Sequence, residues 1–180
     1  VSATDSTAFM GFMNVNRSAY ANYNDETQGV SEKTDEQKAL AKAAMRNANF
    51  RLAVCQAVDR ANFTAQTKGE ELRLTSLCNA YVPGTFVKLE NELTIDVGGQ
   101  AMTFPAGTQY GELLQAFIDA DGYDIQVWDP TGNDGLGSGD SFDGWYNPEA
   151  AKALLEKAIA ELAEYGFEIS AENPVVLDLA

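Results

Sequence analysis

Side chains suited to catalysis are scarce in this chain. Its 180 residues include no histidine and two cysteines, Cys55 and Cys78. The lack of histidine excludes a Ser-His-Asp or Cys-His catalytic pair and removes a principal zinc ligand. Cys55 lies within a helical apolar pattern, which favours a buried thiol. A disulfide with Cys78 is an open alternative, because two cysteines by themselves do not establish one.

Long apolar runs are also missing. None approaches the roughly 20 residues that a membrane-spanning helix requires. With 45% hydrophobic and 22% charged residues, the composition is that of a globular protein. A chain of this length forms one domain of generous size or two small ones. It opens at Val1, with neither an initiator methionine nor a signal peptide, so we expect an excised piece or a processed product.

Positive charge is the third deficit. The net charge is −15, and no Lys or Arg occurs between Lys88 and Lys152, where twelve acidic residues fall. Nucleic acids and anionic membranes both recruit clustered basic residues, so the composition argues against either as a partner. We interpret the acidic stretch as a solvated face that keeps an exported protein soluble. Docking of a basic partner is the alternative.

Periodicity and capping residues predict several helices. Thr34 and Gln37 form a capping box that begins a helix, which we expect to break at residues 47–49. A helix is expected from Tyr110 to a stop at Gly122. Asn147 and Pro148 suit the N-cap and first position of another helix, which Gly166 ends. Two buried stripes are expected, one on Phe50, Ala53, Val54, Ala57 and Val58, the other on Ala151, Leu154, Leu155, Ala158, Ile159 and Leu162.

Extended structure is predicted at fewer places. Residues 93–97 and 100–104 read as a β-hairpin, because Gly98-Gly99 supplies the positive φ that a two-residue turn needs. Single strands are expected at residues 8–15, 123–128 and 174–179. The chain therefore reads as mixed α and β.

A loop rich in Gly and Asp, residues 129–143, offers hard oxygen ligands. It fails the EF-hand calcium template, since Asp134 stands where Gly is needed and Asp140 where the bidentate Glu is needed. We therefore predict no metal and no cofactor. No pair of carboxylates is singled out for acid–base work either, so the chain is not expected to be an enzyme and has no predicted catalytic residue.

Two ordered motifs carry a family resemblance. Residues 50–60 read FRLAVCQAVDR and residues 146–155 read YNPEAAKALL. They match F-R-x-A-[LIV]-x-x-A-[IV]-[DN]-R and Y-[DN]-P-E-x-A-[KR]-x-L-L at every defined position. In this order they resemble the extracytoplasmic solute-binding proteins of peptide-import ABC transporters, the oligopeptide- and dipeptide-binding family.

The resemblance implies an α+β fold of the periplasmic-binding-protein type II class. Family members enclose the peptide between two lobes joined by a hinge. Residues 1–180 correspond to a single fragment of the second lobe, with helices packed on a small sheet. The stretch between Arg60 and Tyr146 is longer than the family's usual spacing, so we expect residues 90–145 to be a subgroup-specific insertion that holds the hairpin, one helix and the acidic loop.

The resemblance also places candidate ligand contacts. It brings Asn14, Tyr81 and Phe86 near the peptide, with core packing as the rival role for the two aromatic residues. Trp128 and Trp145 flank the acidic loop as a stacking platform, or simply anchor it. Residues Arg51, Asp59 and Arg60 of the first motif are expected to cap or pair on the helix surface instead of touching ligand.

The implied function is capture of peptides outside the cytoplasmic membrane and delivery to an ABC permease, with no covalent chemistry. The partners would be a peptide and the permease subunits, with no nucleic acid and no transmembrane segment in this chain. The protein would be lipid-anchored at the cell surface or periplasmic. Two alternatives stay open: binding of another solute, such as a glycan or a metal complex, and a cell-surface interaction module that uses the acidic insertion.

Overall fold

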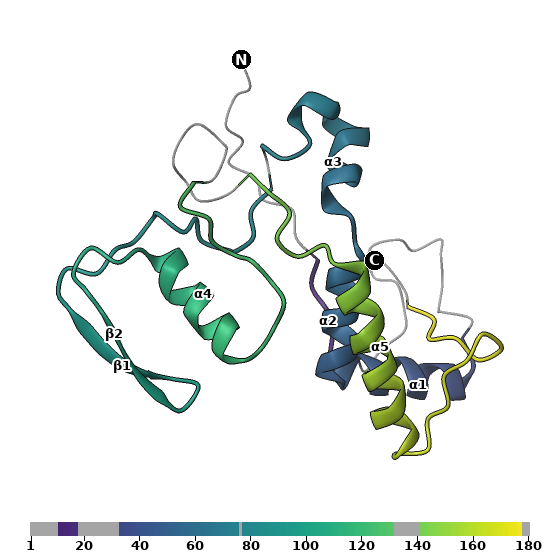
Figure 1. Ribbon diagram of the computed structural model, residues 1–180. Helices are drawn as coiled ribbons and strands as arrows, with labels where there is room; N and C mark the ends of the chain where they lie inside the picture. Colours follow the sequence, from purple (N-terminus) through teal and green to yellow (C-terminus); the bar gives the residue numbers. More distant parts are fainter. Residues whose placement is uncertain (1–10, 18–32, 76, 132–140, 178–180) are drawn as a thin grey trace. The chain divides into compact units, whose positions relative to one another are not determined.

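The computed structural model describes residues 11–17, 33–75, 77–131 and 141–177 (Figure 1). The chain divides into two compact units, one formed by Val1–Ala53 with Ala153–Ala180 and the other by Val54–Lys152. Within the described residues, helices are combined with one two-stranded antiparallel sheet. This mixed architecture confirms the predicted α+β character. None of the described helices is both long and apolar enough to cross a bilayer.

Asn47 separates the first two helices, α1 (Asp35–Arg46) and α2 (Ala48–Ala57). The predicted capping box begins α1, since Thr34 Oγ1 accepts from Gln37 N at 3.2 Å and Gln37 Oε1 accepts from Thr34 N at 3.0 Å. The backbone N–H of Asn47 caps the end of α1, and its Oδ1 accepts from Phe50 N at 2.9 Å. One residue therefore ends a helix and begins the next, which confirms a break at Asn47, whereas Ala48 and Asn49, also predicted to lie in the break, are helical.

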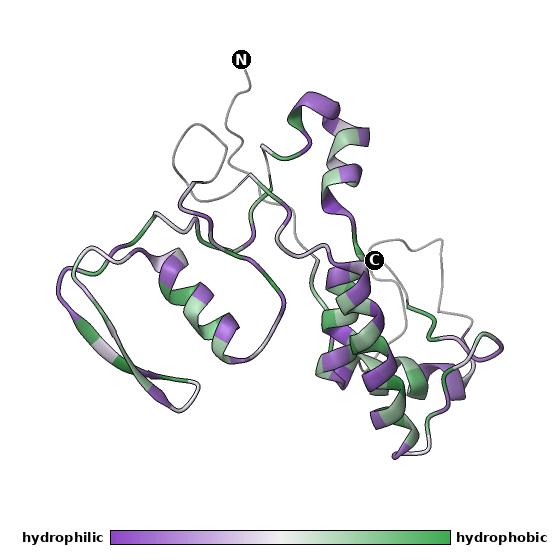
Figure 2. Cartoon of the chain, in the orientation of Figure 1, coloured by the Kyte–Doolittle hydropathy of each residue, from purple (hydrophilic) through white to green (hydrophobic). Residues whose placement is uncertain are grey.

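The predicted apolar stripes of α2 and of α5 (Pro148–Ala163) are buried only in part. Figure 2 shows hydrophobic and hydrophilic residues along both helices, as expected when one side is buried. In α2 the stripe stops early: Val58 lies beyond the helix end and is exposed, whereas the polar Gln56, outside the stripe, is buried. In α5, Leu155 is partly exposed. The first unit buries Leu40, Ala41, Ala44, Phe50, Ala53, Ala158 and Leu162.

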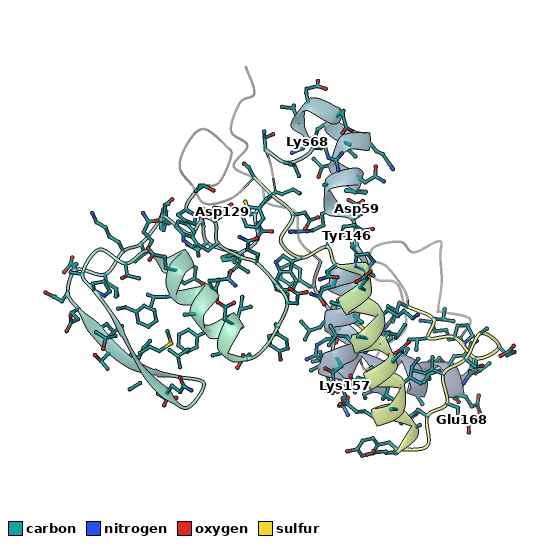
Figure 3. All side chains as sticks on the ribbon, in the orientation of Figure 1. Asp59, Lys68, Asp129, Tyr146, Lys157 and Glu168 are labelled. Carbon is teal, nitrogen blue, oxygen red and sulfur yellow. The ribbon has the colours of Figure 1, made fainter. Side chains whose placement is uncertain are left out.

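The second unit contains α3 (Arg60–Lys68), the 3-10 helix η1 (Glu70–Leu72), strands β1 (Leu93–Val97) and β2 (Gln100–Phe104), and α4 (Tyr110–Ala120). The hairpin has the predicted bounds, and both turn glycines have positive φ. Helix α4 has a capping box between Gln109 and Glu112 and ends before Gly122, as predicted. The sequence pattern did not indicate α3, which follows its N-cap Asp59 and ends at Lys68, both labelled in Figure 3.

The strand predicted at residues 123–128 is absent. The side chain of Gln115 makes the backbone hydrogen bonds there that a neighbouring strand would make. Gln115 of α4 donates to Ile125 O at 3.1 Å, and its Oε1 accepts from Val127 N and Trp128 N. The segment is therefore extended and bonded, but it joins no sheet. Its apolar side is still buried, with Ile125, Val127 and Trp128 in the core of the second unit.

Two further strand predictions are wrong where the structure describes them. Residues 11–15 and 174–177 have no strand assignment, and Phe12 is exposed. An extended segment becomes a strand only when a second backbone pairs with it. Among the described residues, only β1 and β2 form such a ladder. The remaining parts of both predictions, residues 8–10 and 178–179, lie outside the described residues.

Candidate functional site

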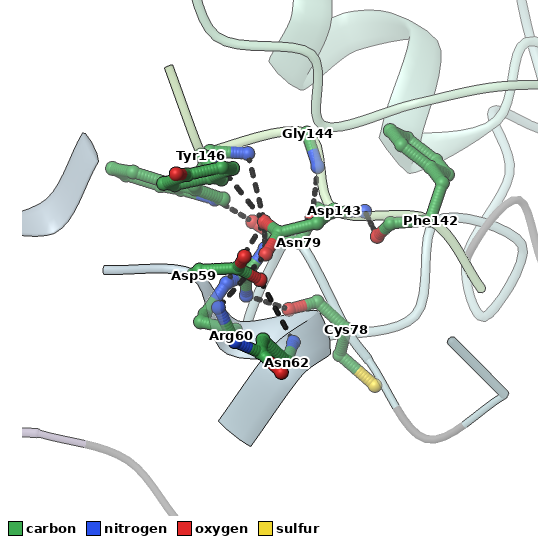
Figure 4. A network of polar contacts seen from close by, with 10 residues as sticks. Asp59, Arg60, Asn62, Cys78, Asn79, Phe142, Asp143, Gly144 and Tyr146 are labelled. Carbon is green, nitrogen blue, oxygen red and sulfur yellow. Dashed lines mark hydrogen bonds and ion pairs between the residues drawn. The ribbon is translucent and has the colours of Figure 1, made fainter. Parts of the chain in front are cut away.

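A polar cluster of Arg60, Asn79 and Asp143 joins three segments of the second unit (Figure 4). The guanidinium of Arg60 donates to Asp143 Oδ1 from Nε at 3.1 Å and also from its terminal nitrogen. The same group donates to Cys78 O at 3.0 Å and to Asn79 Oδ1 at 2.7 Å. The Asp143 side chain is only 8% exposed, so this ion pair lies largely away from water.

Asn79 and Asp143 extend the cluster to the main chain of residues 142–146. The Nδ2 of Asn79 donates to Phe142 O at 2.9 Å, and its Oδ1 accepts from Gly144 N at 3.0 Å. Asp143 Oδ1 accepts from the N–H groups of Trp145 and Tyr146 at 3.2 and 3.3 Å. Asn79 bonds directly to the main chain of residues 142–144, Arg60 bonds both Asn79 and Asp143, and Ser141 N donates to Leu77 O at 3.2 Å. Residues 77–79 and 141–146 are therefore held together.

The two sequence motifs meet in the same unit. Asn147 of the second motif donates its backbone N–H to Gln56 O of the first at 2.9 Å. Its side chain caps α5 through Ala150 N at 3.0 Å, which confirms the predicted N-cap, and it donates to Asp124 Oδ2. Gln56 Nε2 donates to Asp124 O at 2.7 Å. At this junction both motifs therefore support the fold.

Arg51, Asp59 and Arg60 have structural partners. Arg51 donates to Met45 O at 2.8 Å. Asp59 caps α3 by accepting from Asn62 N at 2.8 Å, and Arg60 pairs with Asp143. Capping and pairing were predicted, but the prediction placed them on the surface, whereas Asp143 is mostly buried.

Tyr81 and Phe86 lie on one segment of the second unit and point to solvent, at 82% and 77% exposed. Neither side chain packs into a core within this chain, and ligand contact by either remains a prediction. The segment turns at residues 83–86, where Phe86 N donates to Pro83 O at 2.9 Å. It then pairs with the start of α4, through Gly111 N to Gly84 O and Tyr110 N to Val87 O.

The two tryptophans have different surroundings. Trp128 is buried, and its ring lies against the backbones of Gly84 and Gly111, where an added Cβ would fall 2.3 and 2.1 Å from Cε3. Trp145 is half-buried, and its Nε1 donates to Asn79 O at 2.9 Å. Both rings hold chain segments together in this structure, and ligand contact by either remains a prediction.

Asn14 belongs to the first unit and is exposed. Its Oδ1 accepts from Asn16 N at 3.0 Å in a short turn. Arg46, at the end of α1, donates to Val15 O and Asn16 Oδ1 and so fixes this turn. The other four candidates, Tyr81, Phe86, Trp128 and Trp145, belong to the second unit.

The acidic loop is described only at its ends, since Asn133, Asp134 and Asp140 lie outside the described residues. At the first end, Asp129 Oδ1 accepts from the hydroxyl and the N–H of Thr131 at 2.6 and 2.8 Å. These bonds lower the pKa of the Asp129 carboxyl, the hydroxyl contributing most. Among the described residues, no three Cys, Asp or Glu side chains gather as metal ligands would.

Sequence reasoning overlooked Asn79, Asp143 and Gln56. Asn79 follows the exposed Cys78 in an irregular stretch, and Asp143 ends a run of Gly and Asp residues, so neither stands out by periodicity. The usable signal was Arg60 itself. Its guanidinium forms strong, directed hydrogen bonds with a carboxylate, which made an acidic partner elsewhere in the chain worth seeking.

Comparison with known proteins gives a consistent result, although no family model matches the chain. It is 31% identical over 175 residues to the oligopeptide-binding protein SarA of Streptococcus gordonii, covering 97% of this chain and 21% of that protein. It is 29% identical to AliB of Streptococcus pneumoniae, covering 98% and 22%, and 27% identical to AmiA of the same species, covering 93% and 21%. Both are named oligopeptide-binding proteins.

The chain spans about a fifth of the length of these curated relatives. The match extends over nearly all of its residues, including both motifs, which confirms the resemblance found in the sequence. This chain is therefore homologous to a segment of the oligopeptide-binding protein family.

Proposed function

We propose that this chain is part of the substrate-binding component of an ABC importer, which captures peptides outside the cytoplasmic membrane and delivers them to the permease. The observation that carries the proposal is the homology to oligopeptide-binding proteins along 97% of the chain. The whole protein would be lipid-anchored at the cell surface or periplasmic. It would bind peptide without covalent chemistry.

Within that function, the chain would form part of the second lobe of a type II binding protein, with residues 90–145 as an insertion. Capture would occur by hinge closure, in which the peptide binds the closed state more tightly than the open one. The other lobe would supply the opposing side of the site. Extended peptides are recognised largely through their backbones, while side-chain pockets set preference.

Tyr81 and Phe86 are the strongest candidates for peptide contact in this chain. Large aromatic side chains that stay exposed on a bonded segment are typical of binding surfaces, because they bury much area at little ordering cost. Asn14, which is exposed, and Trp145, which is half-buried, remain proposed contacts, and Trp128 would need its ring uncovered.

The first test is native mass spectrometry of the full-length parent protein, purified without refolding, with released small molecules identified after denaturation. We expect a ladder of mixed short peptides. A single sugar or metal complex would move the function to another solute. An empty protein that shows no thermal shift with peptide mixtures would contradict peptide capture.

A second test addresses the two aromatic residues. Tyr81→Ala and Phe86→Ala in the full-length protein should each weaken binding of a short-peptide library by about tenfold, the loss of roughly 1.4 kcal/mol. The matched control is Tyr165→Ala, because Tyr165 is equally exposed at 79% but belongs to the first unit. Equal weakening in all three variants would argue against contact at Tyr81 and Phe86.

A further inference from the structure

The segment at residues 78–88 is bonded at both ends and, through Gly84 O and Val87 O, to the start of α4, while two of its aromatic side chains remain exposed. At its first end, Arg60 donates to Cys78 O and to the side chain of Asn79, whose backbone O accepts from Trp145 Nε1. At its second end, Lys88 forms a backbone bridge with Gln109. Between these ends the segment carries the two most exposed aromatic side chains of the second unit, Tyr81 and Phe86.

Arg60 is suited to hold the first end because its guanidinium contacts three groups at once. A planar fork can donate to Asp143, Asn79 and a backbone carbonyl in fixed directions, which an ammonium group cannot reproduce. Asp143 keeps the fork in place, since its carboxylate is mostly buried and also accepts from backbone N–H groups. The direction in which the segment leaves residue 79 is therefore set by this cluster (Figure 4).

A binding segment held in place before the ligand arrives loses little conformational freedom on binding. We propose that Arg60, Asn79 and Asp143 form a positioning cluster for peptide binding, acting through Tyr81 and Phe86 without touching the peptide. This inference rests on the proposed function. It gives Arg60, the last residue of the first motif, a role in peptide affinity as well as in folding.

The test is a double-mutant cycle in the full-length protein between Arg60→Lys and Tyr81→Ala. Binding of a fluorescein-labelled random hexapeptide library is followed by fluorescence anisotropy, and stability is followed by thermal melting. Arg60→Lys keeps the charge and removes the fork. The control is Glu161→Gln, because Glu161 accepts comparable bonds from Asn47 and Asn49 in the first unit.

We expect Arg60→Lys to raise the apparent Kd about tenfold in the wild-type background and less than twofold in the Tyr81→Ala background, where the positioned ring is gone. Glu161→Gln should leave Kd unchanged even if it lowers the melting temperature. If Arg60→Lys does not fold, Asn79→Asp takes its place, because it removes the donor to Phe142 O and keeps the acceptor for Arg60.

An unchanged Kd for the Arg60 or Asn79 variant would overturn the positioning role. So would an equal rise in both backgrounds, since the cluster would then act independently of Tyr81. A wild-type protein that does not bind the library would overturn the proposed function and this inference together. Binding by the wild type with an additive cycle would remove only this inference.

Discussion

The contact between Trp128 and two glycines can be tested with a single methyl group. A Cβ at position 111 would lie 2.1 Å from Trp128 Cε3 and 2.6 Å from Cδ2, with the ring's Cζ3 at 2.9 Å. Carbon atoms pack at about 3.5–4.0 Å, so the ring and α4 would have to separate by roughly 1.5 Å. Gly111→Ala therefore overfills the core of the second unit.

Overpacking of this kind costs about 1–3 kcal/mol. Alanine is preferred to glycine in a helix by up to about 1 kcal/mol, which acts in the opposite direction. We therefore expect Gly111→Ala to lower the free energy of unfolding by about 1–2 kcal/mol, measured by urea denaturation followed by circular dichroism. For a chain of this size, that corresponds to a fall in melting temperature of roughly 2–8 °C.

Two comparisons isolate the cause. Gly11→Ala is the matched control, because nothing lies within 4 Å of a Cβ at that position, and it should change stability by less than about 0.5 kcal/mol. In a Trp128→Ala background, Gly111→Ala should become neutral or stabilising. If Gly111→Ala stabilises the chain with Trp128 present, the ring does not rest on α4 and the packing argument is wrong.

Three further predictions concern single polar groups. Asn147→Ala removes the cap on Ala150 N and should lower the free energy of unfolding by about 1–2 kcal/mol in urea denaturation. The pKa of Glu161 is lowered below its ordinary value of 4.5 by hydrogen bonds from the side-chain amides of Asn47, which contributes most, and Asn49. Glu161 therefore stabilises the chain above pH 4.5 and loses this contribution as pH falls through the lowered pKa, so the melting-temperature difference between the wild type and Glu161→Gln should shrink as the pH is lowered below 4.5. Gln56 is buried with Oε1 unbonded, but its Nε2 donates to Asp124 O, so Gln56→Met, which removes both groups at similar volume, should lower the free energy of unfolding by about 0.5–1.5 kcal/mol through the loss of that one bond.

Elements whose decisive contacts lie within a few residues were predictable. The capping box at Thr34, the N-cap at Asn147 and the turn at Gly98-Gly99 each depend on bonds or dihedral angles spanning about four residues, and all three occur as predicted. The family resemblance was also carried by local motifs, because each motif is a run of adjacent residues along a helix and its start.

Partners distant in the sequence were decided by the tertiary structure alone. Arg60 bonds Asn79 and Asp143 across separations of 19 and 83 residues, and no local pattern specifies which amide or carboxylate it will meet. Similarly, the side chain of Gln115 accepts the hydrogen bonds from Val127 N and Trp128 N that a neighbouring strand would otherwise accept. Local bonds follow from adjacent residues, whereas long-range bonds depend on which segments packing brings together, and burial then requires those polar groups to be satisfied.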